Sequence, residues 1–257
     1  MAVRIAIWYG AVTMIERQLD ITTIDGDMPT FVVHPEEGGP HPVVLFQMDA
    51  PGMRPEIHTM ARRLATAGYY VIAPMLYYRW VRSYSLFETG DRDRMFELMN
   101  SLSNTMASAD AAACFAFTDD DPAAAADRCG TVGYCMSGPF ALVVAADHAD
   151  RVRAAASIHG VRLHVDSDDS PHHRLGDITG EIYVACAESD HYAPPEMINA
   201  FESAMAAAGT NGRVEWYPGT EHGFAFAERP AYVREASERH WERMHDLFRR
   251  QLHEVRD

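Results

Sequence analysis

Three side chains in the second half of the sequence could together carry out nucleophilic catalysis. Cys135 lies in the stretch TVGYCMSGPF, Asp190 follows the apolar run IYVACAE, and His222 lies in the turn GTEHG. A thiol becomes a strong nucleophile when a histidine takes its proton, and a carboxylate can hold that histidine in the required orientation. These residue types predict attack on a carbonyl group if the fold brings them together.

Cys135 stands where a predicted strand turns into a predicted helix. A sharp turn at this place lifts the side chain clear of the backbone, and the N-terminus of the helix stabilises a thiolate. The next N–H group, that of Met136, would face a developing oxyanion. The pattern is G-x-S-x-G with cysteine in place of serine, and Ser137 stands where the second glycine would be. A buried structural cysteine would explain the same stretch without catalysis.

The other two groups also follow predicted strands. Asp190 precedes a helix that begins with proline, and His222 lies in a loop flanked by glycines after the last strand. The chain order of nucleophile, acid and base is that of the α/β-hydrolases. The alternatives are a helix-capping aspartate, a surface histidine, and His191 as a rival base.

Strands and helices alternate along the chain and would position these groups. Two segments around Gly26 and Asp27, residues 19–25 and 29–35, predict an antiparallel hairpin. Apolar runs predict parallel strands buried on both faces, at residues 42–48, 69–74, 129–135, 154–160, 182–188 and 214–219. Helical patterns cover residues 55–68, 91–117, 121–127, 194–209 and 229–252. We therefore expect a three-layer α/β/α sandwich with a mostly parallel central sheet, and a site beyond the carboxyl ends of its strands.

Composition limits the classes of partner. The 257 residues carry a net charge of −15, which disfavours nucleic acid and anionic membranes, and no apolar run approaches the ~20 residues that span a bilayer. We expect an N-terminal extension over residues 1–13, as an extra strand, tail or partner contact, and a single domain over residues 14–257. A monomer or homodimer is expected. The four cysteines are Cys114, Cys129, Cys135 and Cys186, and they form no CxxC pair. This spacing favours reduced thiols in the cytoplasm and disfavours a zinc site.

Several stretches resemble the dienelactone hydrolase family of α/β-hydrolases. They are GYCMSG, ESDHYAPPE and PGTEHGFAF, together with PVVLFQMDAPGMRPEI, GYYVIAPMLYYR and RVRAAASIHGVRL. The resemblance runs from about Met14 to the C-terminal helix and implies the α/β-hydrolase fold. It also implies that Cys135 is the nucleophile, that His222 is the general base, and that Asp190 orients the imidazole.

The loop after VLFQM departs from the family. The resemblance implies that the second oxyanion N–H comes from Asp49 or Ala50. In the family a glutamate partners the resting cysteine, but Met48 stands at that place here. Asp49, the next residue, is a candidate to replace the glutamate.

The residues implied for substrate binding depart as well. Family members hold a substrate carboxylate with two arginines; Arg79 matches one of them, whereas Phe226 replaces the other. Any compensation would have to come from Arg54, Arg82 or Arg229. This halved clamp disfavours a muconate-type dienelactone and favours a neutral or bulkier ester or lactone. The expected pocket residues are Tyr77, Tyr78, Trp80, Tyr84, Phe226 and His159.

The sequence thus predicts a hydrolase that cleaves a small carboxylic ester or lactone through a thioester intermediate, without metal or cofactor. His172 and His173 are adjacent and lack the i, i+4 spacing of helical metal ligands. Two alternatives remain open. One is a thiol-redox protein in which Cys186 approaches Cys135, and the other is a non-catalytic relative that binds a small molecule.

Overall fold

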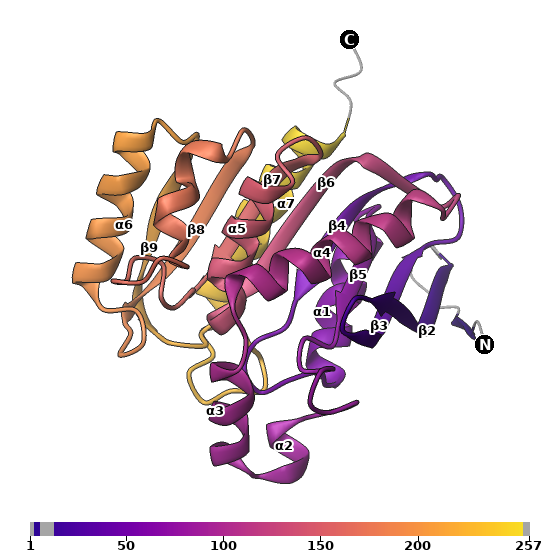
Figure 1. Cartoon of the computed structure of the whole chain (residues 1–257), viewed down its shortest axis with the longest axis horizontal. Helices are drawn as coiled ribbons and strands as arrows, with labels where there is room; N and C mark the ends of the chain where they lie inside the picture. Colours follow the sequence, from indigo (N-terminus) through magenta and orange to yellow (C-terminus); the bar gives the residue numbers. More distant parts are fainter. Residues whose placement is uncertain (1–2, 6–12, 254–257) are drawn as a thin grey trace.

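A single β-sheet organises the chain in the computed structural model, which describes residues 3–5 and 13–253 (Figure 1). The described part contains nine strands in the order β1-β2-β3-β5-β4-β6-β7-β8-β9. The first four strands in this order pair antiparallel, and β5 to β9 pair parallel, which confirms the predicted sheet. The strands are β1 (Val3–Ile5), β2 (Met14–Thr23), β3 (Gly26–Pro35), β4 (His41–Gln47), β5 (Tyr70–Pro74), β6 (Ala124–Tyr134), β7 (Val152–Ile158), β8 (Glu181–Ser189) and β9 (Gly212–Glu221).

Helices cover both faces of this sheet, as a three-layer sandwich requires. The α-helices are α1 (Pro55–Thr66), α2 (Leu86–Thr89), α3 (Arg92–Asn100), α4 (Asn104–Asp119), α5 (Gly138–Asp147), α6 (Pro195–Ala208) and α7 (Arg234–Leu252). Helices α1 and α7 pack on one face, and α4, α5 and α6 pack mainly on the other. Two short 3₁₀ helices are η1 (Cys135–Ser137) and η2 (Pro171–Asp177).

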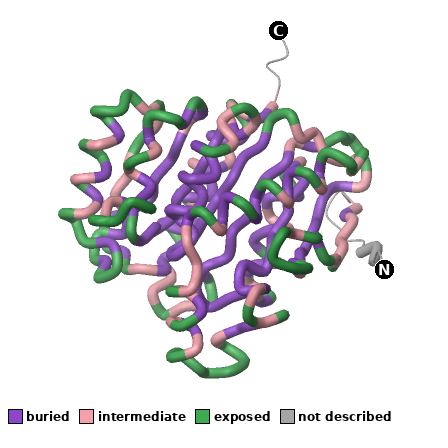
Figure 2. Tube along the Cα trace, in the orientation of Figure 1, coloured by how far each residue is buried: buried purple, intermediate pink, exposed green. Residues whose placement is uncertain are grey.

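Strand β4 shows why the central strands are apolar throughout. Val44 and Phe46 pack in the core beneath α1 and α7, whereas Val43 and Leu45 pack in the core beneath α4, α5 and α6. All four side chains are buried. Because successive side chains point to opposite faces, a strand covered on both sides has no position for an exposed polar residue. Figure 2 shows the central strands as the continuously buried part of the chain.

The predicted hairpin forms, but its turn was placed wrongly by the sequence. Thr23 pairs with Gly26, so the turn lies at Ile24 and Asp25 and not at Gly26 and Asp27. Gly26 has a φ of +125°, which only glycine adopts readily, and it begins β3 directly after the turn. The Thr23 hydroxyl accepts from the Asp25 N–H, which stabilises this shorter turn.

Two helix predictions between β5 and β6 were also wrong. The segment 91–117 is not one helix: α3 ends at Asn100, and α4 begins at Asn104. The Ser103 hydroxyl accepts from the Met106 N–H (3.1 Å) and caps the second helix, which gives the break a local cause. The alanine-rich segment 121–127 is mostly strand, because Ala124 starts β6 and pairs with β4.

Residues near the N-terminus extend the antiparallel edge. Val3–Ile5 form β1 and pair with the start of β2, so these three residues adopt the extra strand that was one of the expectations for residues 1–13. Residues 1–2 and 6–12 lie outside the described residues. No helix in the described ranges is both long and apolar enough to cross a bilayer.

Residues 86–100 form a segment that we call the cap. It contains α2 and α3 and projects from the body of the molecule (Figure 1). Most of its residues are exposed or half-buried, and only Met95 and Leu98 are buried (Figure 2). The Leu86 N–H donates to the Pro51 carbonyl, and Gly52 forms a bridge with Ser85, so the base of the cap is attached to the loop after β4.

Candidate active site

Cys135, Asp190 and His222 lie at the carboxyl ends of β6, β8 and β9. His222 Nδ1 and Asp190 Oδ2 are 2.7 Å apart, which is a short, charge-assisted hydrogen bond. Cys135 and His222 line the same cavity. The parallel strands therefore bring together three residues that are far apart in sequence, at the edge where ligands bind in such sheets.

The Asp190 carboxylate is held on two sides. Its Oδ1 accepts from the N–H groups of Tyr192 (2.8 Å) and Ala193 (3.1 Å), and its Oδ2 faces His222. Asp190 thus orders the loop before α6 and orients the imidazole at the same time, so the two readings of this residue are compatible. His191, the rival base, is exposed and is not among the described residues that line the cavity.

His222 is mostly buried, yet its environment favours the protonated form. Burial by itself lowers the pKa of His222, but the charge of Cys135 and hydrogen bonds to Asp190 and Cys135 raise it to about 10. Opposite charges and hydrogen bonds to the charged form both stabilise it. The site therefore favours an imidazolium at His222, next to Cys135.

The backbone around Cys135 has the geometry of a nucleophile elbow. Cys135 has a φ of +56°, a left-handed conformation that is costly for a residue with a side chain. A Cβ atom at Gly133 would lie 1.9 Å from the Ser137 carbonyl oxygen, and one at Gly138 would lie 2.4 Å from the Gly160 Cα. Only glycine fits at either place, so both glycines are required for the turn.

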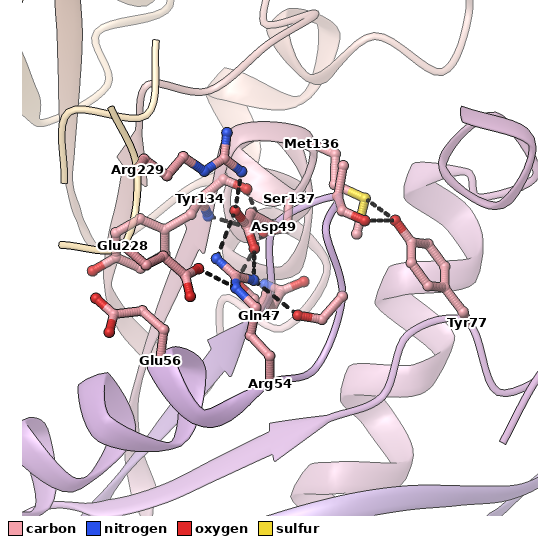
Figure 3. A network of polar contacts seen from close by, with 12 residues as sticks. Gln47, Asp49, Arg54, Glu56, Tyr77, Tyr134, Met136, Ser137, Glu228 and Arg229 are labelled. Atoms are coloured by element: carbon pink, nitrogen blue, oxygen red, sulfur yellow. Dashed lines mark hydrogen bonds and ion pairs between the residues drawn. The ribbon is translucent and has the colours of Figure 1, made fainter. Parts of the chain in front are cut away.

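Ser137 completes the elbow as a structural residue. Its hydroxyl accepts from the Tyr134 N–H (2.9 Å) and lies 3.0 Å from the Gln47 carbonyl oxygen, to which it can donate (Figure 3). It is fully buried. The serine that stands in place of the second glycine therefore ties the end of β6 to the end of β4.

Two backbone N–H groups are candidates to hold an oxyanion. Met136 lies in the first turn of η1, where N–H groups have no acceptor within the helix. Ala50 lines the cavity together with Cys135, whereas Asp49 does not. The Tyr77 hydroxyl donates to the Ala50 carbonyl (2.8 Å) and lies 3.1 Å from Met136 Sδ, so it links the two loops (Figure 3).

Asp49 has a different role from the one that the sequence suggested. Its carboxylate is fully buried and forms ion pairs with Arg54 and Arg229 (Figure 3). Arg54 also pairs with Glu228. Among the described residues, the hydrogen bonds of the Asp49 carboxylate go to Arg54 and Arg229 and not to Cys135. The Asp49 carboxylate is therefore paired with two guanidinium groups, and Asp49 does not replace the family's glutamate beside the thiol.

The residues predicted to bind substrate lie outside the cavity. Arg79 donates twice to Asp110 (2.9 and 2.8 Å) and once to Asp25, and the Tyr78 hydroxyl donates to Asp110 as well. The two side chains are thus committed to Asp110, on the side of the sheet covered by α4. The prediction that Arg79 and Tyr78 bind substrate is therefore corrected.

Phe226 and His159 lie behind the site and not in it. Phe226 is fully buried. The guanidinium carbon of Arg54 lies 5.1 Å from its ring centroid, and that of Arg229 lies 5.3 Å from it. His159 is 1% exposed, and its ring lies 4.8 Å from the ring of His222. Burial, and then the nearby His222, lower the pKa of His159 well below its usual value, so it is a neutral packing partner. Neither residue lines the cavity.

The cavity has a volume of about 320 Å³ and a mainly apolar wall. Its lining comes from the loop after β4, the cap, the elbow, the loop after β7, and the loops around Asp190 and His222. Arg229 does fold in from elsewhere, as one of the expected compensating residues, whereas Arg82 pairs with Asp20 on the surface. No pattern in the sequence predicted the lining residues of the cap and of the loop after β7, which are Leu86, Phe87, Arg92, Met95, Phe96, Met99, Val161 and Arg162.

A metal site is not evident in the described ranges. No group of three or more His, Cys, Asp and Glu side chains within residues 3–5 and 13–253 is arranged to hold an ion. The rings of His164 and His172 are stacked with centroids 3.8 Å apart, and the rings of His172 and His173 are tilted with centroids 3.9 Å apart.

Comparisons with known proteins agree on one family. The profile of the "Dienelactone hydrolase family" matches residues 28–252. A "Putative carboxymethylenebutenolidase" of Methylorubrum extorquens is 29% identical over 240 residues, which cover 92% of this chain and 81% of that protein. The "Carboxymethylenebutenolidase" of Rhodococcus opacus is 26% identical over 216 residues, 81% of each chain.

A solved structure supports the fold. The crystal structure of a "Putative Dienelactone Hydrolase" from Klebsiella pneumoniae superposes with a TM-score of 0.84 at 24% identity, covering 91% of this chain and 98% of that one. The family profile extends from β3 to the last residue of α7, so it includes Cys135, Asp190 and His222. The chain belongs to the dienelactone hydrolase family, as the resemblance of its motifs predicted.

Proposed function

We propose that the protein hydrolyses carboxylic esters or lactones, with Cys135 as nucleophile, His222 as base and acid, and Asp190 as the orienting carboxylate. The observation that carries this proposal is the 2.7 Å bond between His222 and Asp190 at a cavity that Cys135 also lines. The match to the dienelactone hydrolase family and the relatives named carboxymethylenebutenolidase support this class of reaction.

The reaction proceeds through a thioester. The Cys135 thiolate attacks the carbonyl carbon, and the N–H groups of Met136 and Ala50 hold the oxyanion. The tetrahedral intermediate collapses, and the His222 imidazolium gives its proton to the leaving alkoxide. His222, now neutral, takes a proton from water as that water attacks the thioester. Release of the acid returns the thiolate and the imidazolium.

Several features favour esters and lactones over amides. A thiolate is a good leaving group, so an intermediate formed from an amide returns to reactants unless the amine is protonated first. An alkoxide from an ester or strained lactone departs more readily. The apolar wall of the cavity suits the carbon skeleton of such a substrate.

A thiol-redox role is less well supported. Cys135 belongs to the core beneath α1 and α7, whereas Cys186 belongs to the core on the opposite face of the sheet. Burial also raises the pKa of the Cys186 thiol, which suppresses the reactive thiolate.

Turnover of p-nitrophenyl acetate tests the proposal. We expect the wild-type protein to release p-nitrophenolate and Cys135→Ala to lose the turnover by about 10³-fold or more. Cys129→Ala is the matched control, because Cys129 is a buried thiol in β6, the strand that leads to Cys135, and burial raises its pKa. Turnover that survives in Cys135→Ala, or no turnover of any simple ester or lactone by the wild type, would overturn the proposal.

A further inference from the structure

The cavity wall carries three arginines and no carboxylate among its described lining residues. They are Arg92 in α3, Arg162 in the loop after β7, and Arg229 in the loop before α7. The chain as a whole has a net charge of −15. A concentration of positive charge around the entrance to the nucleophile, in a protein so acidic, sets this cavity apart from the rest of the surface.

Two of these arginines differ from most others in the protein. Arginines elsewhere in the described chain mostly pair with carboxylates, as Arg63 does with Glu238 and Arg250 with Glu181. No carboxylate lies within ion-pair distance of Arg92 or Arg162 among the described residues, and both are exposed. Their positive charges are therefore free to interact with a ligand.

Arg162 is fixed relative to Cys135 by the backbone. The N–H of Val161, the preceding residue, donates to the Cys135 carbonyl oxygen (3.1 Å). Arg162 itself has a φ of +55°, a left-handed conformation that is unfavourable for a residue with a side chain. Its guanidinium donates to Asn100 Oδ1 (2.8 Å) at the end of α3, so it also joins the loop to the cap.

Arg92 and Arg229 add positive charge on other parts of the wall. The guanidinium carbon of Arg92 lies 6.0 Å from the ring centroid of Phe96, another lining residue. Arg229 pairs with Asp49 through one nitrogen, while its Nε is buried and has no acceptor among the described residues. The charge of Arg229 is thus shared, and Arg92 and Arg162 carry the uncompensated part.

Apolar side chains lie on the same wall as these charges. Phe87, Met95, Phe96 and Met99 come from the cap. A ligand that satisfies both features has an apolar chain next to its carbonyl group and a negative charge at the far end of that chain.

We propose that the protein acts preferentially on esters whose acyl chain is apolar and ends in a carboxylate, and that Arg92 and Arg162 bind this carboxylate. The inference rests on the proposed ester hydrolysis. It assigns anion binding to α3 and to the loop after β7, since Arg79 is committed to Asp110 and Phe226 is buried. Exposed charges are screened by salt, so the preference depends on ionic strength.

A matched pair of substrates tests this inference. Mono-p-nitrophenyl adipate has a terminal carboxylate, and p-nitrophenyl heptanoate has an uncharged chain of the same length. We expect the adipate to have a kcat/KM about tenfold above that of the heptanoate at low salt, through a lower KM, and the ratio to fall as NaCl is added. Equal or lower kcat/KM for the adipate at low salt overturns the inference while leaving ester hydrolysis intact.

Variants assign the effect to the two arginines. The double variant Arg92→Gln, Arg162→Gln is expected to bring the adipate-to-heptanoate ratio close to one. Arg128→Gln is the matched control, because Arg128 is an exposed arginine of β6, without a carboxylate partner in the described chain, and lies seven residues before the nucleophile. The control should keep the ratio of the wild type. A double variant that also keeps it would show that other groups bind the carboxylate.

Alkylation of Cys135 gives a readout that does not depend on turnover. Iodoacetate is an anion and iodoacetamide is its neutral counterpart, and peptide mass spectrometry can follow both reactions at Cys135. We expect the ratio of the iodoacetate rate to the iodoacetamide rate to fall at least threefold in the double variant and to stay constant in Arg128→Gln. An unchanged ratio in the double variant contradicts the inference, even if no ester is hydrolysed and the proposed function itself fails.

Discussion

The strand-end loops that carry the triad and the cap that lines the cavity are fixed in different ways. At the elbow, Gly133 admits no Cβ atom, and His222 and Asp190 share a short hydrogen bond within a buried setting. The cap instead contributes side chains such as Phe87, which is 53% exposed. The proposed chemistry therefore depends on a few backbone and polar contacts at the ends of the strands. The part of the cavity wall that the cap contributes is built from side chains such as Phe87, and we expect their substitution to change activity only slightly.

Replacement of Asp190 probes the strict region and should give the largest effect. In Asp190→Asn the carboxylate no longer fixes the tautomer of His222 or stabilises its imidazolium, so kcat should fall about 10²- to 10⁴-fold. Steady-state kinetics with p-nitrophenyl acetate measures this loss. Glu188→Gln is the control, since Glu188 is an exposed carboxylate near the end of the same strand, and it should change kcat less than twofold. A similar fall of kcat in Asp190→Asn and Glu188→Gln would show that Asp190 has no special role.

Asp49 tests whether the strict region extends below the site. Asp49→Asn leaves the buried Arg54 and the cavity-lining Arg229 without their shared carboxylate, and breaking such a pair costs about 3 kcal/mol or more of unfolding free energy. Urea denaturation measures this change. Asp246→Asn removes an exposed partner of Arg249 and Arg250 on α7 and should cost less than about 1 kcal/mol. If Asp49→Asn costs no more than Asp246→Asn, the buried ion pairs do not hold the loop.

The pKa of His222 tests the coupling within the triad. Burial lowers this pKa, and the charge of Cys135 with hydrogen bonds to Asp190 and Cys135 raises it to about 10. In Cys135→Ser the negative charge is gone, so the pKa should move down towards the ordinary value of about 6.5. NMR titration of the His222 imidazole in both proteins measures the shift. Equal pKa values in the two proteins would show that the thiolate is not its cause.

The same pKa predicts how stability depends on pH. The pKa of His222 in the folded state lies above the unfolded value of about 6.5. Protonation of His222 therefore stabilises the fold, and this stabilisation is fully present below about pH 6.5. This stabilisation is lost as the pH rises through about 10. In Cys135→Ser the pKa of His222 is lower, so protonation of His222 should stabilise the fold less. That smaller stabilisation should be lost at a lower pH than in the wild type. Urea denaturation at a series of pH values, compared between the two proteins, provides the measurement.

A cap residue should give the smallest effect. Phe96→Ala enlarges the apolar cavity without touching the triad, so KM for p-nitrophenyl heptanoate should rise about threefold while kcat stays within twofold. Phe117→Ala is the control, because Phe117 packs on the other face of the sheet, and it should leave KM unchanged. A large fall of kcat in Phe96→Ala would mean that the cap also positions the catalytic groups.

The predictability of these regions from sequence follows the same division. The sheet, and the places of Cys135, Asp190 and His222 at its strand ends, could be predicted because strand periodicity, glycine positions and chain order are signals present in the sequence. The cavity wall was not accessible, because Arg162 and Met99 lie in a loop and a short helix whose places are set by tertiary contacts. The misplaced role of Arg79 has the same origin. Its partner Asp110 is 31 residues away, and no local pattern reveals such a pair.

The central claim is that Cys135 forms the acyl-enzyme intermediate, and mass spectrometry tests it most directly. The protein is mixed with excess p-nitrophenyl acetate, quenched in acid during turnover, and digested for peptide analysis. We expect one acetyl group on Cys135 in the wild-type protein and no acetylated peptide after the same treatment of Cys135→Ala. Acetylation of another residue such as Ser137, or turnover without any acyl-enzyme at Cys135, would contradict it.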